Sequence, residues 1–226
     1  MKKYAVIVAG GMGQRMGTDI PKQFLLLQNK PVLWHTLQTF LMAFADLQII
    51  LVLPKENLSE GENLCKDLHA EERIRISFGG KTRFHSVQNG LALVKEPCIV
   101  FVHDGVRCLL SQNLIHRCYD QTLERGSAIP AVSAMDSIRM VDEYTHKVVN
   151  RNQVRILQTP QTFLSSLLIP AYQQTYQESF TDEATVMEAF GNEVMLIEGE
   201  YENLKITRPT DLLIAQSILT ARLSKK

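Results

Sequence analysis

The sequence lacks an excess of charge of either sign. Lysine and arginine together number 24 among the 226 residues, and aspartate and glutamate also number 24. No block of like charge stands out along the chain, so no basic face is predicted that would bind duplex nucleic acid or an anionic membrane. Any anion-binding site must therefore be local.

Cysteine is also scarce, and no apolar run is long. The cysteines lack the Cys-x-x-Cys spacing of redox and zinc motifs, and neither they nor the six histidines form a ligand cluster, so no protein metal site is predicted. Without an apolar run long enough for a secretory leader or a membrane span, we expect a cytoplasmic protein with reduced thiols. The length suits a single domain over residues 1–226. The four cysteines are Cys65, Cys98, Cys108 and Cys118.

The chain opens with a strand that leads into a glycine-rich loop. The apolar run 4–9 is typical of a parallel strand buried on both faces. Four glycines follow it: Gly10, Gly11, Gly13 and Gly17. Glycine permits positive φ angles and a close approach of a ligand to the backbone, and such a loop can cradle phosphate oxygens. Arg15 and Lys22 add two cations that suit the same anion.

Two common nucleotide motifs are absent. The dinucleotide fingerprint Gly-x-Gly-x-x-Gly requires a glycine where this chain has Met16. A Walker A loop ending at Gly80-Lys81-Thr82 requires a glycine where this chain has Arg75. A NAD site and an ATPase site are therefore disfavoured.

Apolar runs alternate with amphipathic segments, which is typical of an α/β protein with a mostly parallel sheet. Further strands are expected at 48–53, 73–78, 97–103, 127–132, 193–197 and 203–207, and helices at 34–44, 56–68, 83–94, about 164–177, from about 182, and 208–223. In open parallel sheets, ligands bind beyond the carboxyl ends of the strands. Asp104 and Arg107 follow one such strand, although Asp104 could instead cap a helix.

Two other positions suit a ligand. Gly79 and Gly80 precede a helix, whose N-terminal N–H groups favour an anion or a nucleobase. Thr181 precedes a helix with acidic residues in its first turn. These acidic residues are a normal helix cap, which could leave the Thr181 hydroxyl free for a ligand.

Helical periodicity disappears in residues 135–158, which we call the arm. Two short strands, 137–141 and 147–151, flank a polar turn and predict a β-hairpin. An isolated two-stranded ribbon is marginally stable in water, so we expect the arm to pack against a partner subunit.

These segments together resemble the methylerythritol-phosphate cytidylyltransferases of the non-mevalonate isoprenoid pathway. The matching residues are Ala9-Gly10-Gly11-x-Gly13-x-Arg15-Met16, Pro21-Lys22-Gln23, Gly79-Gly80-x-x-Arg83, Ser86-Val87, Val102-His103-Asp104, Arg107, Gln158-Thr159-Pro160-Gln161, Thr181-Asp182-Glu183-Ala184 and Asn203-Leu204-Lys205-Ile206-Thr207. The resemblance implies a Rossmann-like mixed α/β fold of the nucleotide-diphospho-sugar transferase type, with a protruding β-arm that forms a homodimer. It also implies that CTP and 2-C-methyl-D-erythritol 4-phosphate react to give 4-diphosphocytidyl-2-C-methyl-D-erythritol and pyrophosphate.

The same resemblance implies roles for individual residues. Catalysis would fall to Arg15, Lys22, Arg151 and Lys205. The nucleotide would be bound by Ala9, Gly10, Gly11, Gly13, Arg15, Lys22, Gly79, Gly80, Ser86 and Asp104. The acceptor would be bound by Asp104, Arg107, Ser137, Arg151, Thr181 and Lys205, with Ser137 and Arg151 supplied by the neighbouring subunit's arm. Lys81, Gly105, Val106, Cys108 and Ser137 depart from the residues usual in that family, and Lys81 puts nucleotide contacts in doubt.

The chemistry agrees with this set of residues. A phosphate monoester is already anionic near pH 7, because its second pKa is about 6, so its in-line attack on the α-phosphorus needs no general base. The reaction instead needs fixed cations, together with Mg²⁺ held mainly by the CTP phosphates. Two alternatives stay open at this point: a ribitol-5-phosphate cytidylyltransferase and a non-catalytic nucleotide-binding module on the same fold.

Overall fold

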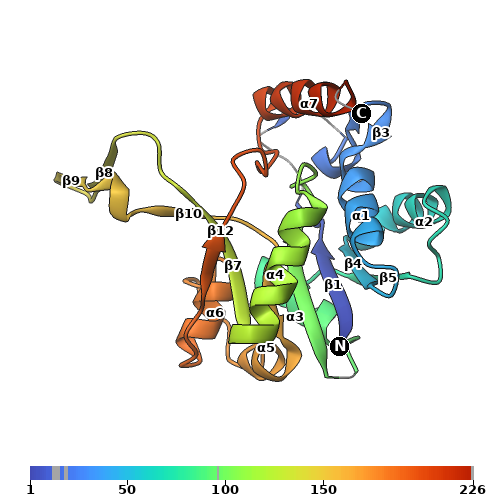
Figure 1. Ribbon diagram of the computed structural model, residues 1–226, viewed down its shortest axis with the longest axis horizontal. Coiled ribbons are helices and arrows are strands. Elements are labelled where there is room, and N and C mark those ends of the chain that lie inside the picture. Colours follow the sequence, from blue (N-terminus) through green and yellow to red (C-terminus); the bar gives the residue numbers. More distant parts are fainter. Residues whose placement is uncertain (12–15, 18–19, 96, 225–226) are drawn as a thin grey trace.

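An eight-stranded mixed sheet forms the centre of the molecule (Figure 1). The computed structural model describes residues 1–11, 16–17, 20–95 and 97–224. The sheet has the order β10-β7-β11-β6-β1-β4-β5, and β12 pairs with β7. Its strands are β1 (Lys2–Val8), β4 (Gln48–Leu53), β5 (Ile74–Phe78), β6 (Cys98–Asp104), β7 (Ser127–Ser133), β10 (Arg155–Leu157), β11 (Gln161–Leu164) and β12 (Leu196–Glu198).

Strand directions match the predicted, mostly parallel sheet. β1 lies between β4 and β6 and is parallel to both, and β5 is parallel to β4. β11 is antiparallel to both of its neighbours, β6 and β7, and β10 is antiparallel to β7. The chain therefore forms a mixed α/β fold, as the sequence predicts.

Helices cover both faces of the sheet because alternate residues of each strand point to opposite faces. Ala5 and Ile7 of β1 pack on one face with α1 (Val32–Ala43), α2 (Leu58–Asp67) and α4 (Gln112–Arg125). Val6 packs on the other face with α3 (Arg83–Leu91), α5 (Ser165–Ala171) and α6 (Glu183–Ala189). α7 (Pro209–Leu223) contributes to a third apolar cluster that includes Val106 and Ile206.

Short elements join these layers. They are η2 (Lys22–Phe24), β2 (Leu26–Leu27), β3 (Lys30–Pro31), η3 (Lys55–Asn57) and η4 (Arg151–Gln153). All four cysteines lie in the described part of the chain, where they are buried and form no disulfide bond. Among the described residues, no helix has both the length and the apolar character needed to cross a membrane.

The predicted strand at 203–207 is wrong. In the structure this segment joins no sheet, although the backbone N–H of Ile206 donates to the carbonyl of Val106 at 3.1 Å. Its apolar residues pack outside the sheet in the cluster with α7, where Ile206 is buried and Leu204 is half-buried, which explains why the sequence pattern resembles that of a strand. Two predicted helices are also too long, because α3 ends at Leu91 and α5 at Ala171.

The predicted hairpin is confirmed. β8 (Ile138–Val141) and β9 (His146–Val149) pair antiparallel to form a separate two-stranded sheet. It projects away from the main sheet (Figure 1). It carries exposed apolar side chains, among them Val141 and Val148.

Candidate active site

The candidate site lies where three loops meet at the carboxyl edge of the parallel strands. Val8, at the end of β1, is in register with Asp104 at the end of β6. The backbone N–H of Gly105 donates to Val8 at 2.9 Å, and that of Gly79 donates to Leu53 at 2.9 Å. This register brings the first glycine loop, Asp104 and the loop before α3 to one edge of the sheet.

Two pockets open at this edge. The glycine-loop pocket has a volume of about 350 Å³, and the smaller Thr181 pocket about 170 Å³. Glycines and four cationic side chains are prominent in the lining of the glycine-loop pocket, which consists of Val8, Ala9, Gly10, Gly11, Lys22, Gln23, Gly80, Lys81, Thr82, Arg83, Ser86, Asp104, Val106 and Lys205. The Thr181 pocket is lined by Arg83, Asp104, Arg107, Leu157, Gln158, Thr159, Gln161, Thr181, Asp182 and Lys205. Arg83, Asp104 and Lys205 line both pockets.

Gly10 and Gly11 leave space beside the backbone of the glycine loop and do not form a left-handed turn. Among the described glycines of this loop, Gly17 has a positive φ of 65°, whereas Gly10 and Gly11 do not adopt the positive φ that the sequence allowed. Among the described residues, a Cβ added at Gly10 would meet no atom within 4 Å, which leaves room for a ligand beside this backbone.

Lys22 reaches the same pocket from η2, directly after Pro21. It is a buried lysine, and its Nζ donates to the carbonyl of Ile206 at 2.9 Å. The neighbouring Gln23 side chain donates to the carbonyl of Ala9 at 2.9 Å. These two bonds tie η2 to the glycine loop and to the segment that carries Lys205.

Asp104 is the acidic centre of the site. Its Oδ2 lies 2.8 Å from Lys205 Nζ and 3.8 Å from Arg107 Nε, and its Oδ1 lies 3.2 Å from Arg83 Nε. Burial would raise the pKa of this carboxyl, but the charges of Arg83, Lys205 and Arg107 outweigh burial and hold the pKa well below its usual range. Asp104 is therefore a fixed anion and does not serve as a proton carrier near pH 7.

A hydrogen-bonded chain fixes the backbone around Asp104. His103 Nε2 lies 3.2 Å from the carbonyl of Arg107, which can only accept, so Nε2 carries the proton. Nδ1 then accepts from the Thr159 hydroxyl at 3.0 Å, and that oxygen accepts from the Asp104 N–H at 3.1 Å. Burial lowers the pKa of His103 to about 3, in agreement with a neutral ring.

The segment Gln158–Gln161 holds the two sides of the Thr181 pocket together. Asn203 Nδ2 donates to the carbonyl of Thr159 at 2.9 Å, which fixes the segment that carries Lys205. Gln161 Nε2 donates to Asp182 at 2.9 Å, and its Oε1 accepts from the Ala184 N–H at 2.9 Å, which fixes the start of α6. The carbonyl of Thr159 and the side chain of Gln161 therefore hold in place the segment that carries Lys205 and the start of α6.

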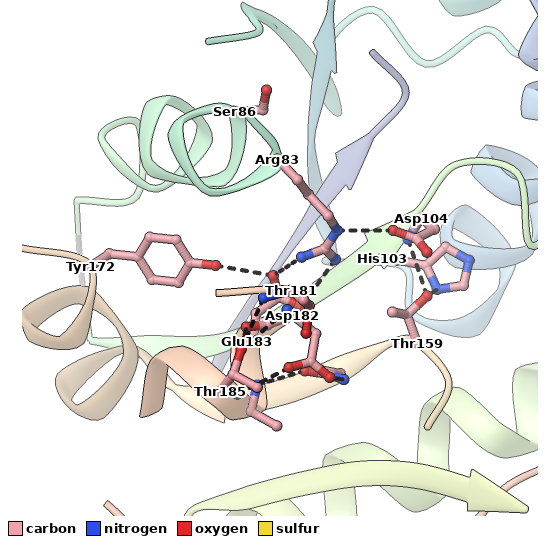
Figure 2. A network of polar contacts seen from close by, with 12 residues as sticks. Arg83, Ser86, His103, Asp104, Thr159, Tyr172, Thr181, Asp182, Glu183 and Thr185 are labelled. Atoms are coloured by element: carbon pink, nitrogen blue, oxygen red, sulfur yellow. Dashed lines mark hydrogen bonds and ion pairs between the residues drawn. The ribbon is translucent and has the colours of Figure 1, made fainter. Parts of the chain in front are cut away.

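Arg83 extends across the site (Figure 2). Its Nη1 and Nη2 form a two-point pair with the carboxylate of Glu183, the second contact at 3.1 Å, while its Nε reaches Asp104. The Tyr172 hydroxyl donates to Glu183 at 3.0 Å. Asp182, rather than Glu183, caps α6, since its side chain accepts from the Thr185 N–H. The two acidic residues therefore have different roles: Asp182 caps α6, and Glu183 pairs with Arg83.

The structure brings together many of the residues that the sequence selected. Ala9, Gly10, Gly11, Lys22, Gly80, Ser86 and Asp104 line the glycine-loop pocket, and Asp104, Arg107, Thr181 and Lys205 line the Thr181 pocket. Gly79 lies behind Ser86 and is not among the lining residues. Ser137 and Arg151 line a hollow on the arm instead. Gly13 and Arg15 lie outside the described residues.

Arg83 and Glu183 are the functional candidates that sequence reasoning missed. Both stand in segments selected for other reasons, Arg83 after the glycine pair and Glu183 after Thr181. An acid in the first turn of a helix is an ordinary choice, because the helix dipole favours negative charge there, whereas the dipole does not favour a cation at the first position, which Arg83 occupies. A buried acid requires a cationic partner, so burial of Glu183 would have indicated its pairing with Arg83. Burial of that residue cannot be read from the sequence.

Among the described residues, no group of three or more His, Cys, Asp or Glu side chains is placed to hold a metal ion. The described lining of the glycine-loop pocket includes one carboxylate, Asp104, which is already paired with three cations. This donor set suits a divalent ion that arrives with phosphate ligands of its own.

Comparison with known proteins identifies a family. A family model described as 2-C-methyl-D-erythritol 4-phosphate cytidylyltransferase matches residues 4–221. A protein of that name from Bacteroides thetaiotaomicron is 47% identical over 219 residues, which cover 97% of this chain and 100% of the relative. Among solved structures, the 4-diphosphocytidyl-2C-methyl-D-erythritol synthase of Anaerococcus prevotii has a TM-score of 0.83 at 27% identity, covering 97% of this chain and 98% of that one. The 2-C-methyl-D-erythritol 4-phosphate cytidylyltransferase of Francisella tularensis has a TM-score of 0.80 at 30% identity, covering 96% and 99%.

Proposed function

Because the chain belongs to the 2-C-methyl-D-erythritol 4-phosphate cytidylyltransferase family, we propose that its two adjoining pockets form the active site for that reaction. The enzyme is a nucleotidyltransferase that couples CTP to 2-C-methyl-D-erythritol 4-phosphate and releases pyrophosphate. The observation that carries the site assignment is the sharing of Arg83, Asp104 and Lys205 by both pockets. Two substrates bound side by side would meet at these three residues.

The glycine-loop pocket suits CTP. The open backbone at Gly10 and Gly11 and the ammonium of Lys22 offer donors and charge to a triphosphate. Arg15 belongs to the same proposed set by sequence and lies outside the described residues. On the other side of the pocket, Gly80 and Ser86 are placed for the nucleoside, and Gly79 supports them by packing behind Ser86.

The Thr181 pocket suits the acceptor. Arg107 and Lys205 supply charge for a phosphate monoester, and the exposed Thr181 supplies a hydroxyl for the polyol. The acceptor phosphate attacks the α-phosphorus of CTP, the new P–O bond forms as the bond to the β-phosphate oxygen breaks, and pyrophosphate leaves. The acceptor oxygen is already anionic near pH 7, so the residues of the site orient two anions and neutralise charge in the transition state.

Mg²⁺ fits this arrangement as a companion of the triphosphate. Its ligands would be chiefly phosphate oxygens and water, because Asp104 is committed to ion pairs. When bound, the ion neutralises charge on the phosphates of CTP. The side chains described above then have the task of holding both substrates in line.

The arm completes the proposed assembly. Its exposed apolar side chains, Met140, Val141, Tyr144 and Val148, suit a homodimer in which each arm packs on the other subunit. Ser137 and Arg151 lie together on the arm, where Arg151 Nη1 donates to the carbonyl of Met135 at 2.6 Å. We assign these two residues to the acceptor site of the partner, and residues 1–226 to one cytidylyltransferase domain that includes the arm.

The alternatives left open by the sequence are not favoured. The relatives described above carry the methylerythritol-phosphate name, and no observation points to ribitol phosphate or to a binding module without catalysis.

The proposal is tested by ³¹P NMR of the wild-type enzyme with CTP, Mg²⁺ and 2-C-methyl-D-erythritol 4-phosphate. We expect the resonances of a nucleoside diphosphate ester and of pyrophosphate to appear together. Unchanged CTP after prolonged incubation would contradict the proposal.

A further inference from the structure

Glu183 is a fully buried carboxylate to which the proposed chemistry gives no task. It is the first residue of α6, its exposed fraction is 0%, and the helix is capped by Asp182. It lines neither pocket. A buried carboxylate is costly unless it is paired, and here the partners are Arg83, through two contacts, and Tyr172.

The pairing fixes the orientation of Arg83. Its Nη1 and Nη2 are held by Glu183 on one side, and its Nε is held by Asp104 on the other (Figure 2). A planar guanidinium with contacts on both sides cannot turn without losing at least one of them. Arg83 therefore presents a fixed charge at the boundary of the two pockets.

Apolar packing supports the same contact. Phe84, the neighbour of Arg83 on α3, stacks on Tyr172 with ring centroids 4.8 Å apart and also contacts Phe180 at 5.4 Å. The start of α3 and residues 180–183 are thereby joined by an ion pair and an aromatic cluster.

We propose that Glu183 is a positioning residue, which holds the Arg83 guanidinium between the CTP pocket and the acceptor pocket and so aligns the two substrates. The inference rests on the proposed function, since it uses the assignment of the pockets to CTP and acceptor. Without the Glu183 charge, Arg83 is left with Asp104, where it competes with Lys205 for the same carboxylate. Arg83 and Lys205 are then no longer held in the positions that align the acceptor.

The test is a double-mutant cycle in the purified enzyme. Glu183→Gln keeps the shape of the side chain and removes its charge, and we expect kcat/KM for 2-C-methyl-D-erythritol 4-phosphate to fall by about 10-fold or more, with KM for CTP changed by less than about 3-fold. Arg83→Gln should lower the same parameter at least as much. Because Glu183 acts through Arg83, the double variant should be no worse than Arg83→Gln. Effects that multiply, or a Glu183→Gln enzyme with wild-type kcat/KM, would overturn the proposal.

Controls separate positioning from folding. Glu188→Gln makes the same chemical change at an exposed position of α6 and should leave kcat/KM unchanged. If Glu183→Gln does not fold, Arg83→Lys is the deciding variant. One ammonium cannot reproduce the contacts that the guanidinium makes with both Glu183 and Asp104, so kcat/KM for 2-C-methyl-D-erythritol 4-phosphate should fall. A wild-type kcat/KM in Arg83→Lys would overturn the proposal. Wild-type enzyme that fails to turn over CTP would remove the proposed function. An active wild type with an unaffected Glu183→Gln variant would remove this inference alone.

Discussion

Lys205 Nζ lies 2.8 Å from Asp104 Oδ2, although one residue ends a central strand and the other lies on a segment that joins no sheet. The two side chains differ in burial, since Lys205 is 41% exposed and Asp104 only 11%. Removal of one partner should therefore have a different effect from removal of the other.

Asp104→Ala should destabilise the fold. The substitution leaves the charges of Arg83, Arg107 and Lys205 close together without their shared anion, and loss of one member of a buried pair costs about 3–5 kcal/mol. Urea unfolding at pH 7 measures this free energy.

Lys205→Ala is the matched change at the exposed end of the pair. It should lower the free energy of unfolding by less than about 1 kcal/mol, because water screens an exposed cation. Equal losses in the two variants would contradict the asymmetric burial of the pair.

Lys22→Ala should reduce turnover far more than stability. Lys22 lines the glycine-loop pocket, and loss of one donor to transition-state charge typically lowers kcat by about 10²- to 10³-fold. Arg15→Ala should have an effect of the same size. Lys30→Ala, which removes a lysine paired with Asp67 away from both pockets, is the control and should keep near-normal kcat. Near-normal turnover in either active-site variant would disprove its assigned role.

The arm assignment predicts complementation between subunits. Arg151→Ala and Lys22→Ala homodimers should both be nearly inactive, whereas hybrid dimers should regain activity because each hybrid keeps one intact site. The measurement is activity after the two variants are mixed and allowed to exchange subunits. If hybrids form and stay inactive, Arg151 acts in its own subunit.

The free energy of unfolding should decrease as the pH is lowered, because His103 is buried and neutral in the folded protein. Its pKa in the folded state is lowered to about 3, while in the unfolded chain it is about 6.5. Between these values the unfolded state binds more protons, so acidification favours unfolding by up to about 1.4 kcal/mol per pH unit. His35 contributes in the same direction, since burial also lowers its pKa.

His103→Gln tests this effect. The slope of unfolding free energy between pH 6 and 4 should become shallower in the variant, because His103, the fully buried one of these two histidines, is gone. Carboxylates such as Asp104 lose their contribution only at lower pH, since their pKa is about 4 even in the unfolded chain. A slope equal to that of wild type would show that His103 takes up a proton in the folded protein.

Much of the fold could be predicted from the sequence because the sheet is buried on both faces. Continuous apolar runs identified β1, β4 and β6, and the strand-end rule placed Asp104 at the site. The arm was predicted from the loss of helical periodicity. The segment that carries Lys205 was mistaken for a strand, because burial under α7 produces the same apolar pattern as a sheet.

The site was harder to predict, since its charges are organised by contacts between distant residues. Arg83 and Glu183 are 100 residues apart in the chain, so no local pattern in the sequence pairs them. Likewise, the sequence could not show that Thr159 and His103 would share a hydrogen bond or that Gln161 would hold the start of α6. Such pairings depend on how strands β6 and β11 lie side by side.

The most direct test of the central claim is Mg²⁺-dependent pyrophosphate release from CTP, with 2-C-methyl-D-erythritol 4-phosphate or ribitol 5-phosphate as acceptor. We predict a higher kcat/KM with the methylerythritol substrate, and loss of this activity in Lys22→Ala. Faster release with ribitol phosphate, or no release with either acceptor, would contradict the account.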